Sequence, residues 1–218
     1  GSAAQKREIT KRLCDLIGNM LPITDQEIKR YVERIVEDLS SEQLRDCLKR
    51  EYSYRDRIRE KIRSLTTGHA ESVFYQWLAA DRIETRAEYL LPESIAPVST
   101  GPSIAGSLYT SEGQLNAWEA EVINRIANLD NMLFWHKIIE RKGFCINGCI
   151  NHYPDFLVRT KNGKTLLVEA KGDDRDNSDS SRKLKLGQAW ANRAGNEFRY
   201  LRVFDANSIE GAFRLDAL

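Results

Sequence analysis

The fold of the C-terminal half is decided by the stretch PDFLVRTKNGKTLLVEAK at residues 154–171. Two apolar runs flank Asn162-Gly163, a dipeptide that is typical of hairpin turns. The stretch therefore predicts two antiparallel strands, the first beginning near Asp155 and the second ending near Lys171. Because side chains alternate between the two faces of a strand, Glu169 and Lys171 should point the same way.

The face that Asp155 occupies depends on the register of this hairpin. A two-residue turn places Asp155 opposite Ala170 and away from Glu169, whereas a three-residue loop with Gly163 left-handed places Asp155 opposite Glu169. The second register also collects one set of apolar side chains on a single face: Phe156, Val158, Leu166, Val168 and Ala170. Since a slip by one residue would scramble both faces, burial should select the three-residue loop.

In this register, Asp155, Glu169 and Lys171 share one face. Neighbouring carboxylates repel each other unless a cation lies between them. Carboxylate oxygens are ligands that Mg²⁺ prefers, and the bound ion keeps waters and takes up substrate phosphate. Lys171 could position the water or the phosphate as a point charge. The residue set predicts Mg²⁺-dependent hydrolysis of a nucleic-acid backbone, with Mn²⁺ as a substitute cation.

A helix before the strands offers a third carboxylate. Glu119 lies at helical spacing from Val122, Ile123 and Ile126, on the stripe that should face the sheet, whereas Glu121 lies off that stripe. An acidic residue on a core-facing stripe needs a partner. We therefore expect Glu119 to complete or support the site as a third metal ligand.

The chain as a whole divides into two parts by pattern. Residues 3–91 are predicted to form an α-helical module, with capping-box patterns at Thr24-Asp25-Gln26-Glu27 and at Ser40-Ser41-Glu42-Gln43. The proline-containing segment 92–107 is predicted to be a linker. Residues 108–218 follow in the order helix, several strands, helix and strand, which indicates a mixed α/β domain with a central sheet flanked by helices.

Composition excludes several classes of protein. The 218 residues carry 33 Lys and Arg against 32 Asp and Glu, a formal net charge of +1, so the chain does not bind nucleic acid by bulk charge. A hydrophobic content of 41% is typical of a folded globular protein. No apolar run is long enough to span a membrane. The 4 cysteines are few and unevenly spaced, which favours reduced thiols and a cytoplasmic location.

The motifs together resemble a known family. Pro154-Asp155, then Glu169-Ala170-Lys171, with Glu119 on an upstream helix, resemble the PD-(D/E)xK nuclease superfamily, whose core is a helix, three strands, a helix and a strand. From about residue 108 onward, the chain is more closely similar to the C-terminal nuclease region of type III restriction Res-subunit-like, DEAD/DEAH-type helicase–nuclease proteins of phage defence.

This resemblance implies a restriction-endonuclease-like fold and a DNA endonuclease activity used in restriction and antiviral defence. It implies that Asp155 and Glu169 bind Mg²⁺ with help from Glu119, and that Lys171 is catalytic. It also implies that a helicase or ATPase region, in the same full-length protein or in a partner subunit, accompanies this part. The chain contains no Gly-x-x-x-x-Gly-Lys-Ser/Thr phosphate-binding loop.

Two further groups of residues are candidates for contacts with nucleic acid. The helix after the second hairpin strand carries Lys183, Lys185 and Gln188, a position from which related nucleases approach substrate phosphates. In the helical module, bases outnumber acids between Lys49 and Arg63, and a ridge along one helix could follow a DNA backbone: Arg55, Arg59 and Arg63. Ordinary solvated helix faces are the simpler interpretation of both groups.

Other interpretations of the same residues stay open. The acidic pair could be a solvated strand edge, or the fold could be a non-catalytic module that binds DNA or docks a partner subunit. Cys145, Cys149 and His152 have a spacing that suggests zinc but lack a fourth ligand nearby, so buried thiols and a loop histidine are the simpler expectation. His152 could also border the proposed site, because it lies close to Asp155.

Overall fold

The computed structural model describes residues 3–172, 178–205 and 213–214. The chain forms two compact units, Gly1–Tyr75 and Gln76–Leu218. The division lies within a long helix and therefore earlier in the chain than the proline-containing segment 92–107, which belongs to the second unit. None of the described helices combines the length and the apolar character that crossing a membrane requires.

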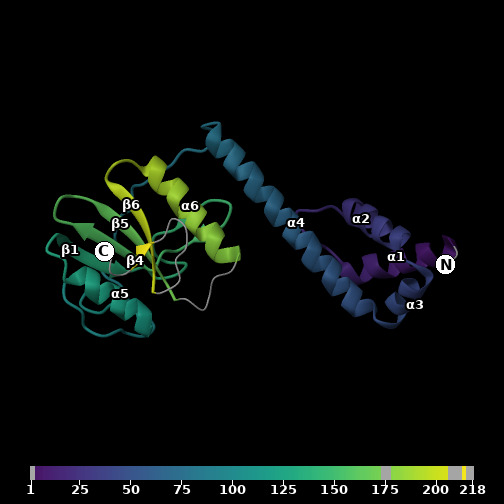
Figure 1. Cartoon of the computed structure of the whole chain (residues 1–218), viewed down its shortest axis with the longest axis horizontal. Coiled ribbons are helices and arrows are strands. Elements are labelled where there is room, and N and C mark those ends of the chain that lie inside the picture. The colour runs from purple at the N-terminus through teal and green to yellow at the C-terminus, as the bar shows by residue number, and fades with distance from the viewer. Residues whose placement is uncertain (1–2, 173–177, 206–212, 215–218) are drawn as a thin grey trace. The chain divides into compact units, whose positions relative to one another are not determined.

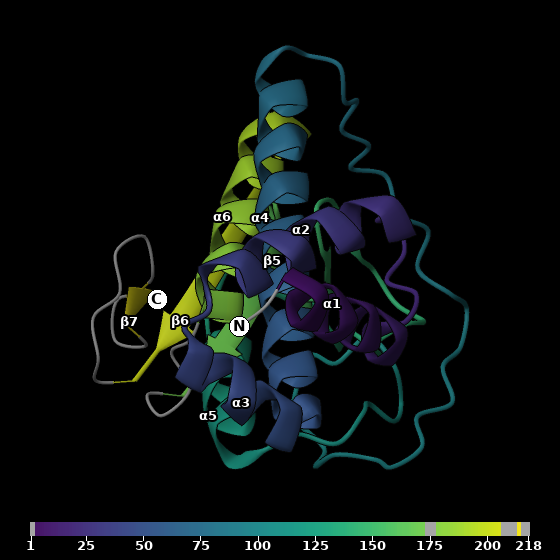
Figure 2. The same ribbon diagram turned by 90° about the vertical axis from the view of Figure 1, so that its right-hand side faces the viewer.

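The N-terminal unit is helical, as predicted. Its elements are α1 (Ala3–Ile17), α2 (Asp25–Asp38), α3 (Ser41–Lys49) and the first part of α4 (Glu51–Ala79). The three shorter helices gather around the first part of α4 (Figure 1 and Figure 2). Both predicted capping boxes are confirmed: Thr24 and Glu27 satisfy each other's backbone amides at the start of α2, and Ser40 and Gln43 do so at the start of α3.

An apolar core holds these four helices together. One stripe of each helix is buried in it: Ile9, Leu13 and Ile17 from α1; Ile28, Val32 and Val36 from α2; Leu44 and Cys47 from α3; Ile58 and Ile62 from α4. The helical spacing of these residues along the sequence is the reason that each helix buries one face. Helix α4 ends at Ala79, so residues 80–91, which we placed in the helical module, are not helical.

The C-terminal unit is built on a mixed five-stranded sheet in the order β1-β4-β5-β6-β7. These strands are β1 (Met132–Lys137), β4 (Phe156–Thr160), β5 (Thr165–Lys171), β6 (Phe198–Phe204) and β7 (Phe213–Arg214), and β2 (Ile146–Asn147) pairs separately with β3 (Asn151–His152). Strands β1, β4 and β5 are antiparallel neighbours, and β6 runs parallel to β5. The prediction of a mixed α/β class is confirmed.

The predicted hairpin register is also confirmed. Phe156 pairs with Val168 and Arg159 with Thr165, and the amide of Thr160 donates to the carbonyl of Lys164 at 2.9 Å. Gly163 has φ of +83°, which is the left-handed conformation that the three-residue loop requires. Extending this register by one residue places Asp155 beside Glu169.

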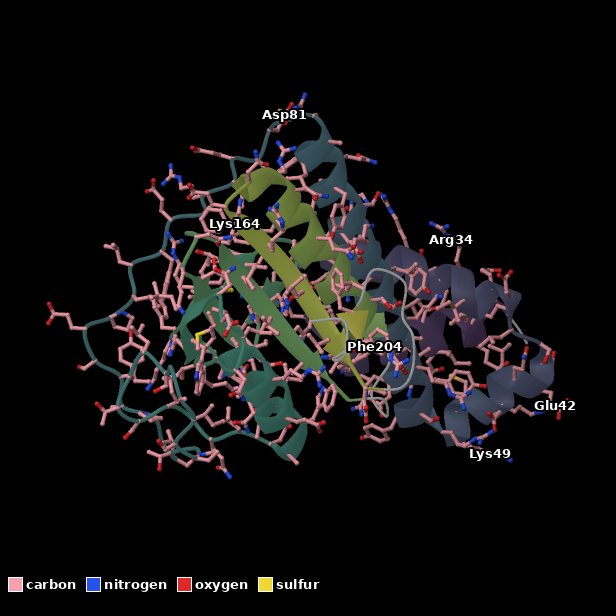
Figure 3. The ribbon with its side chains drawn as sticks, turned by 60° about the vertical axis from the view of Figure 1, so that its left-hand side comes forward. Arg34, Glu42, Lys49, Asp81, Lys164 and Phe204 are labelled. Carbon is pink, nitrogen blue, oxygen red and sulfur yellow. The ribbon has the colours of Figure 1, made fainter. Side chains whose placement is uncertain are left out.

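Two helices cover the two faces of the sheet. Helix α5 (Ala117–Ala127) packs on the face formed by Phe156, Val158 and Val168, and α6 (Ser178–Ala194) packs on the opposite face, where Gly187 approaches the ring of Tyr200 (Figure 1). Glu169 and Lys171 belong to the α6 face. They lie at the end of the sheet marked by Phe204, which pairs with Lys171, and away from the end marked by Lys164 (Figure 3).

The end of the segment predicted to be a linker lies beside the outer edge of β1. The indole Nε1 of Trp135 donates to the carbonyl of Ala105 at 2.9 Å, and the amide of Trp135 donates to the carbonyl of Gly106 at 3.0 Å. Ile104 is buried in the α5-side core. Residues 105–107 therefore cover part of an edge strand, which the proline-rich and aperiodic sequence of the segment does not predict.

Candidate functional site

A polar cavity of about 750 Å³ opens at the end of the sheet where β4 begins and β5 ends. Most of its lining side chains are charged or polar: Glu119, Lys137, Glu140, Arg141, Asn151, Asp155, Glu169 and Lys183. Ile138, Tyr153 and Pro154 complete the lining. The three carboxylates proposed from the sequence, Asp155, Glu169 and Glu119, all line this one cavity. It is therefore the candidate functional site.

Asp155 is held by two neighbouring strands. It comes immediately before β4, and its Oδ2 accepts a hydrogen bond of 2.8 Å from the amide of Ala170 on β5. Its Oδ1 accepts a hydrogen bond of 3.0 Å from the ammonium of Lys137 on β1. The carboxylate is thus fixed in place, and each of its oxygens keeps capacity to accept a further bond or to bind a cation.

Glu169 is the least satisfied of the three carboxylates. Its side chain is 14% exposed, and its buried Oε2 makes no hydrogen bond among the described residues. Burial, together with the negative charge of Asp155, raises the pKa of Glu169 to about 8. A buried carboxylate oxygen without a partner costs free energy, which a bound cation would recover.

A histidine lies close to Glu169, as one of the two interpretations of His152 from the sequence expected. His152, on β3, is fully buried, and its Nε2 lies 2.8 Å from the hydroxyl of Tyr200 and 3.9 Å from Oε2 of Glu169. Burial, assisted by the positive charge of Lys183, lowers the pKa of His152 to about 4. The expectation of a simple loop histidine was wrong, because the short β2–β3 ribbon turns this side chain inward.

Lys137 is the residue of the site that sequence reasoning missed. Its ammonium lies 3.0 Å from Oδ1 of Asp155 and 3.0 Å from Oε1 of Glu119, and 5.0 Å from the centre of the Phe156 ring. Burial alone would lower the pKa of Lys137, but the two carboxylates raise it above its usual value. The signal in the sequence is weak, since a lysine at the end of an apolar strand normally points into solvent.

Glu119 contacts both the start of its own helix and Lys137. Its Oε2 accepts from the amide of Asn116, and its own amide donates to the Asn116 side chain, which forms the capping box of α5. Its Oε1 faces Lys137. The predicted core-facing placement is consistent with this geometry, and the partner that an acid on this stripe needs is Lys137.

A second buried acid, Glu112, fixes the backbone of Lys137. Oε2 of Glu112 accepts a 3.0 Å hydrogen bond from the amide of Lys137 and lies 2.9 Å from Nδ1 of His136. Both side chains are almost fully buried, and the ring of Tyr109 packs edge-on against His136. No motif in the sequence pairs residues 112 and 136, because they approach each other only when the segment before α5 folds against β1.

Of the other residues proposed for the C-terminal site, Lys183 lines the cavity and Lys171, Lys185 and Gln188 do not. Lys183 lines it and also pairs with Asp179 at 3.3 Å. Lys171 ends β5 on the same face as Glu169, and its positive charge acts to lower the pKa of Glu169, but it is not among the described residues that line the cavity. Lys185 is exposed on α6, Gln188 is half-buried there, and neither lines the cavity.

The basic ridge proposed on α4 is partly used within the helical unit. Arg59 is half-buried and donates a hydrogen bond to the carbonyl of Ile17, the last residue of α1. Arg55 pairs with Asp56 at 2.8 Å and lies over the ring of Tyr52, whereas Arg63 is exposed. The three arginines therefore do not form one free row of cations.

The carboxylates suit a cation that needs few protein ligands. Within the described ranges, no three His, Cys, Asp or Glu side chains converge as a metal-binding group, and this covers the cluster of Cys145, Cys149 and His152. Mg²⁺ is commonly bound through one or two carboxylates, with waters and substrate oxygens completing its shell. Asp155 and the unpartnered oxygen of Glu169 fit that requirement.

Comparison with family models, with curated proteins and with solved structures found no match for this chain.

Proposed function

We propose that the C-terminal unit hydrolyses phosphodiester bonds of DNA in a Mg²⁺-dependent reaction, as a nuclease of the PD-(D/E)xK type. The observation that carries the proposal is the placement of Asp155 and Glu169 one residue beyond the Phe156–Val168 pair of the β4–β5 hairpin, where both line one polar cavity. Oε2 of Glu169 is buried and has no hydrogen-bond partner among the described residues, so a cation bound between the two carboxylates would supply the partner that this oxygen lacks.

The order of elements supports this proposal. Helix α5 is followed by the antiparallel strands β1, β4 and β5, then by α6 and the parallel strand β6. This succession agrees with the helix, three strands, helix and strand that the resemblance implies. The positions of the two acidic residues support it as well. Asp155 comes immediately before β4, the second of these strands, and Glu169 lies near the end of β5, the third.

Each residue then has a distinct role. Asp155 and Glu169 would hold the Mg²⁺, which when bound supplies an activated water and stabilises negative charge on the phosphate. Lys183 and Arg141 line the same cavity and would attract the phosphate backbone. Lys171, on the face of Glu169, would position the water or the phosphate through its charge. Glu119 would act by holding Lys137.

The resemblance also suggests a cellular setting. A nuclease unit of this kind would work beside a helicase or ATPase region, in the same protein or in a partner subunit, during restriction of foreign DNA. Because the net charge of the chain is only +1, such a nuclease would engage DNA through local contacts and bound metal and not through its overall charge.

A second candidate function is a non-catalytic module that binds DNA or docks a partner subunit. The observation that favours it is Lys137, whose ammonium already neutralises Asp155 and Glu119 without any metal. A fold stabilised in this way could keep its acids for structural reasons alone.

One assay separates the two candidates. The full chain is incubated with supercoiled and linear DNA in Mg²⁺ or Mn²⁺, and compared with Asp155→Ala, Lys171→Ala and the control Lys161→Ala, which alters an exposed residue of the hairpin loop outside the cavity. The nuclease proposal expects cutting that both site variants reduce at least about 100-fold and that the control retains. Cutting that survives Asp155→Ala contradicts the proposal, and metal binding without any cutting supports the non-catalytic module.

A further inference from the structure

The cavity already contains a cation of its own. The ammonium of Lys137 lies between Asp155 and Glu119, at 3.0 Å from an oxygen of each, and the three side chains are only 14%, 20% and 13% exposed. The ring of Phe156 lies 5.0 Å from the ammonium on the same face of the sheet. Lys137 therefore occupies a position between two carboxylates where a divalent ion could otherwise bind.

The lysine is fixed at both ends. Its backbone amide is bound by Glu112, which is itself buried against His136. Its stem follows the face of β1 that packs on Phe156, because Lys137 and Phe156 are direct partners across β1 and β4. A side chain held at its backbone and at its charged tip is a permanent part of the cavity wall and does not behave as a mobile surface group.

Both oxygens of Glu119 already have a partner. One of them closes the capping box of α5 and the other faces Lys137. A metal bound directly by Glu119 at the second oxygen would compete with the ammonium of Lys137 for the same side of the carboxylate. Glu169 differs, because its Oε2 has no hydrogen-bond partner within the described structure.

Electrostatics limits how many cations this cavity can hold. A divalent ion between Asp155 and Glu119 would lie in van der Waals contact with the ammonium of Lys137, and like charges at such distances repel strongly in a partly buried site. A divalent ion between Asp155 and Glu169 would instead be held from the α6 face of the sheet, to which Glu169 belongs, whereas Lys137 pairs with Phe156 on the α5 face.

We propose that Lys137 is a built-in counterion that fills the Asp155–Glu119 position, so that the site binds a single divalent cation, at Asp155 and Glu169. This inference rests on the proposed function, since it assigns the number of metal ions at the same site. It changes the role of Glu119 from metal ligand to positioning residue for Lys137.

The test counts bound Mn²⁺ on the full chain, by calorimetric titration and by the loss of the free-ion paramagnetic resonance signal. Wild type should bind one Mn²⁺. Lys137→Met, which keeps most of the volume and removes the charge, should bind two, and Lys137→Arg, which keeps the charge, should bind one. Circular dichroism establishes that each variant is folded.

A second variant decides the question even if Lys137→Met does not fold. Glu119→Gln preserves the capping box, since glutamine serves equally at that position. We expect it to bind one Mn²⁺ with an affinity within about 3-fold of wild type, because Glu119 contacts the lysine and not the ion.

The outcomes distinguish this inference from the proposed function. One Mn²⁺ in both wild type and folded Lys137→Met, two in wild type, or an affinity reduced more than 10-fold in Glu119→Gln would each overturn the counterion role while leaving a metal site in place. Wild type that binds no Mn²⁺ at all contradicts the proposed function itself, and the counterion role with it.

Discussion

The amide of Ala170 donates a hydrogen bond of 2.8 Å to Oδ2 of Asp155, so that the carboxylate of Asp155 continues the β4–β5 pairing beyond Phe156, the first residue of β4. This contact fixes a side chain that would otherwise lie at a frayed strand end. It also directs the other oxygen of Asp155 toward Lys137. The site is therefore stabilised by the same hairpin that places Glu169 beside it.

Replacing Asp155 by asparagine should destabilise the protein. The amide nitrogen that replaces one oxygen would face either the Ala170 amide or the Lys137 ammonium, and a buried donor facing a donor loses a hydrogen bond. We expect a loss of about 1–2 kcal/mol in the free energy of unfolding, measured by urea titration. Asp130→Asn, at an exposed position, should change it by less than about 0.5 kcal/mol. Equal effects of the two substitutions would argue against the Ala170 contact.

The pKa of Glu169 predicts how stability depends on pH in the absence of metal. Its folded pKa of about 8 lies above the ordinary value of 4.5, so between these values the folded protein holds a proton that the unfolded chain has lost. Stability should therefore fall as pH rises through this window. His152 acts oppositely, because its pKa falls from 6.5 to about 4, so its effect is confined to pH below about 6.5.

This dependence can be isolated above pH 6.5. In EDTA, the free energy of unfolding of wild type should fall by about 2 kcal/mol between pH 6.5 and 8.5, following about 1.4 kcal/mol for each unit of pKa shift. Glu169→Gln, which cannot ionise, should lose most of this slope. A slope that is the same in both proteins would show that another group is responsible.

The hairpin loop can be tested through its glycine. Gly163 has φ of +83°, so Gly163→Ala forces a left-handed conformation on a residue with a Cβ and should cost about 1 kcal/mol. Gly68, in the interior of α4, has open space around its missing Cβ, so Gly68→Ala should stabilise the protein by about 0.5–1 kcal/mol. Thermal unfolding of the two variants should shift in opposite directions, and a neutral Gly163→Ala would contradict the three-residue loop.

Arg59 should matter for stability more than for DNA binding. Its guanidinium donates to the carbonyl of Ile17 at the end of α1, where backbone acceptors otherwise lack partners. Arg59→Ala should lower the free energy of unfolding by about 1–2 kcal/mol. Arg57→Ala removes the same charge from an exposed position of the same helix and serves as the control. If Arg59→Ala weakened DNA binding without altering stability, the helix-end contact would not be its main role.

The sequence predicted the features that arise from local pattern. Residues close together in the chain form the capping boxes at Thr24 and Ser40 and set the hairpin register around Gly163. Their spacing in the sequence is therefore enough to predict these features. The placement of Asp155 beside Glu169 follows from that register, because only one alignment buries Phe156 and Val168 on one face.

The remaining parts of the site depend on contacts between distant segments. Lys137, Glu119 and Asp155 come from β1, α5 and the start of β4, and Glu112 reaches Lys137 from an irregular segment. No spacing rule relates these positions. The hydrogen bonds that Ala105 and Gly106 make to β1 were missed for the same reason, because no local pattern in this stretch predicts them.

We propose that Asp155 and Glu169 together hold a divalent cation. The most direct measurement is a crystal of the full chain grown with Mn²⁺, from which anomalous difference density locates the ion. We expect one peak in contact with a carboxylate oxygen of Asp155 and with Oε2 of Glu169, and we expect Glu169→Gln to weaken or abolish it. A peak elsewhere in the cavity, or none at saturating Mn²⁺, would contradict it.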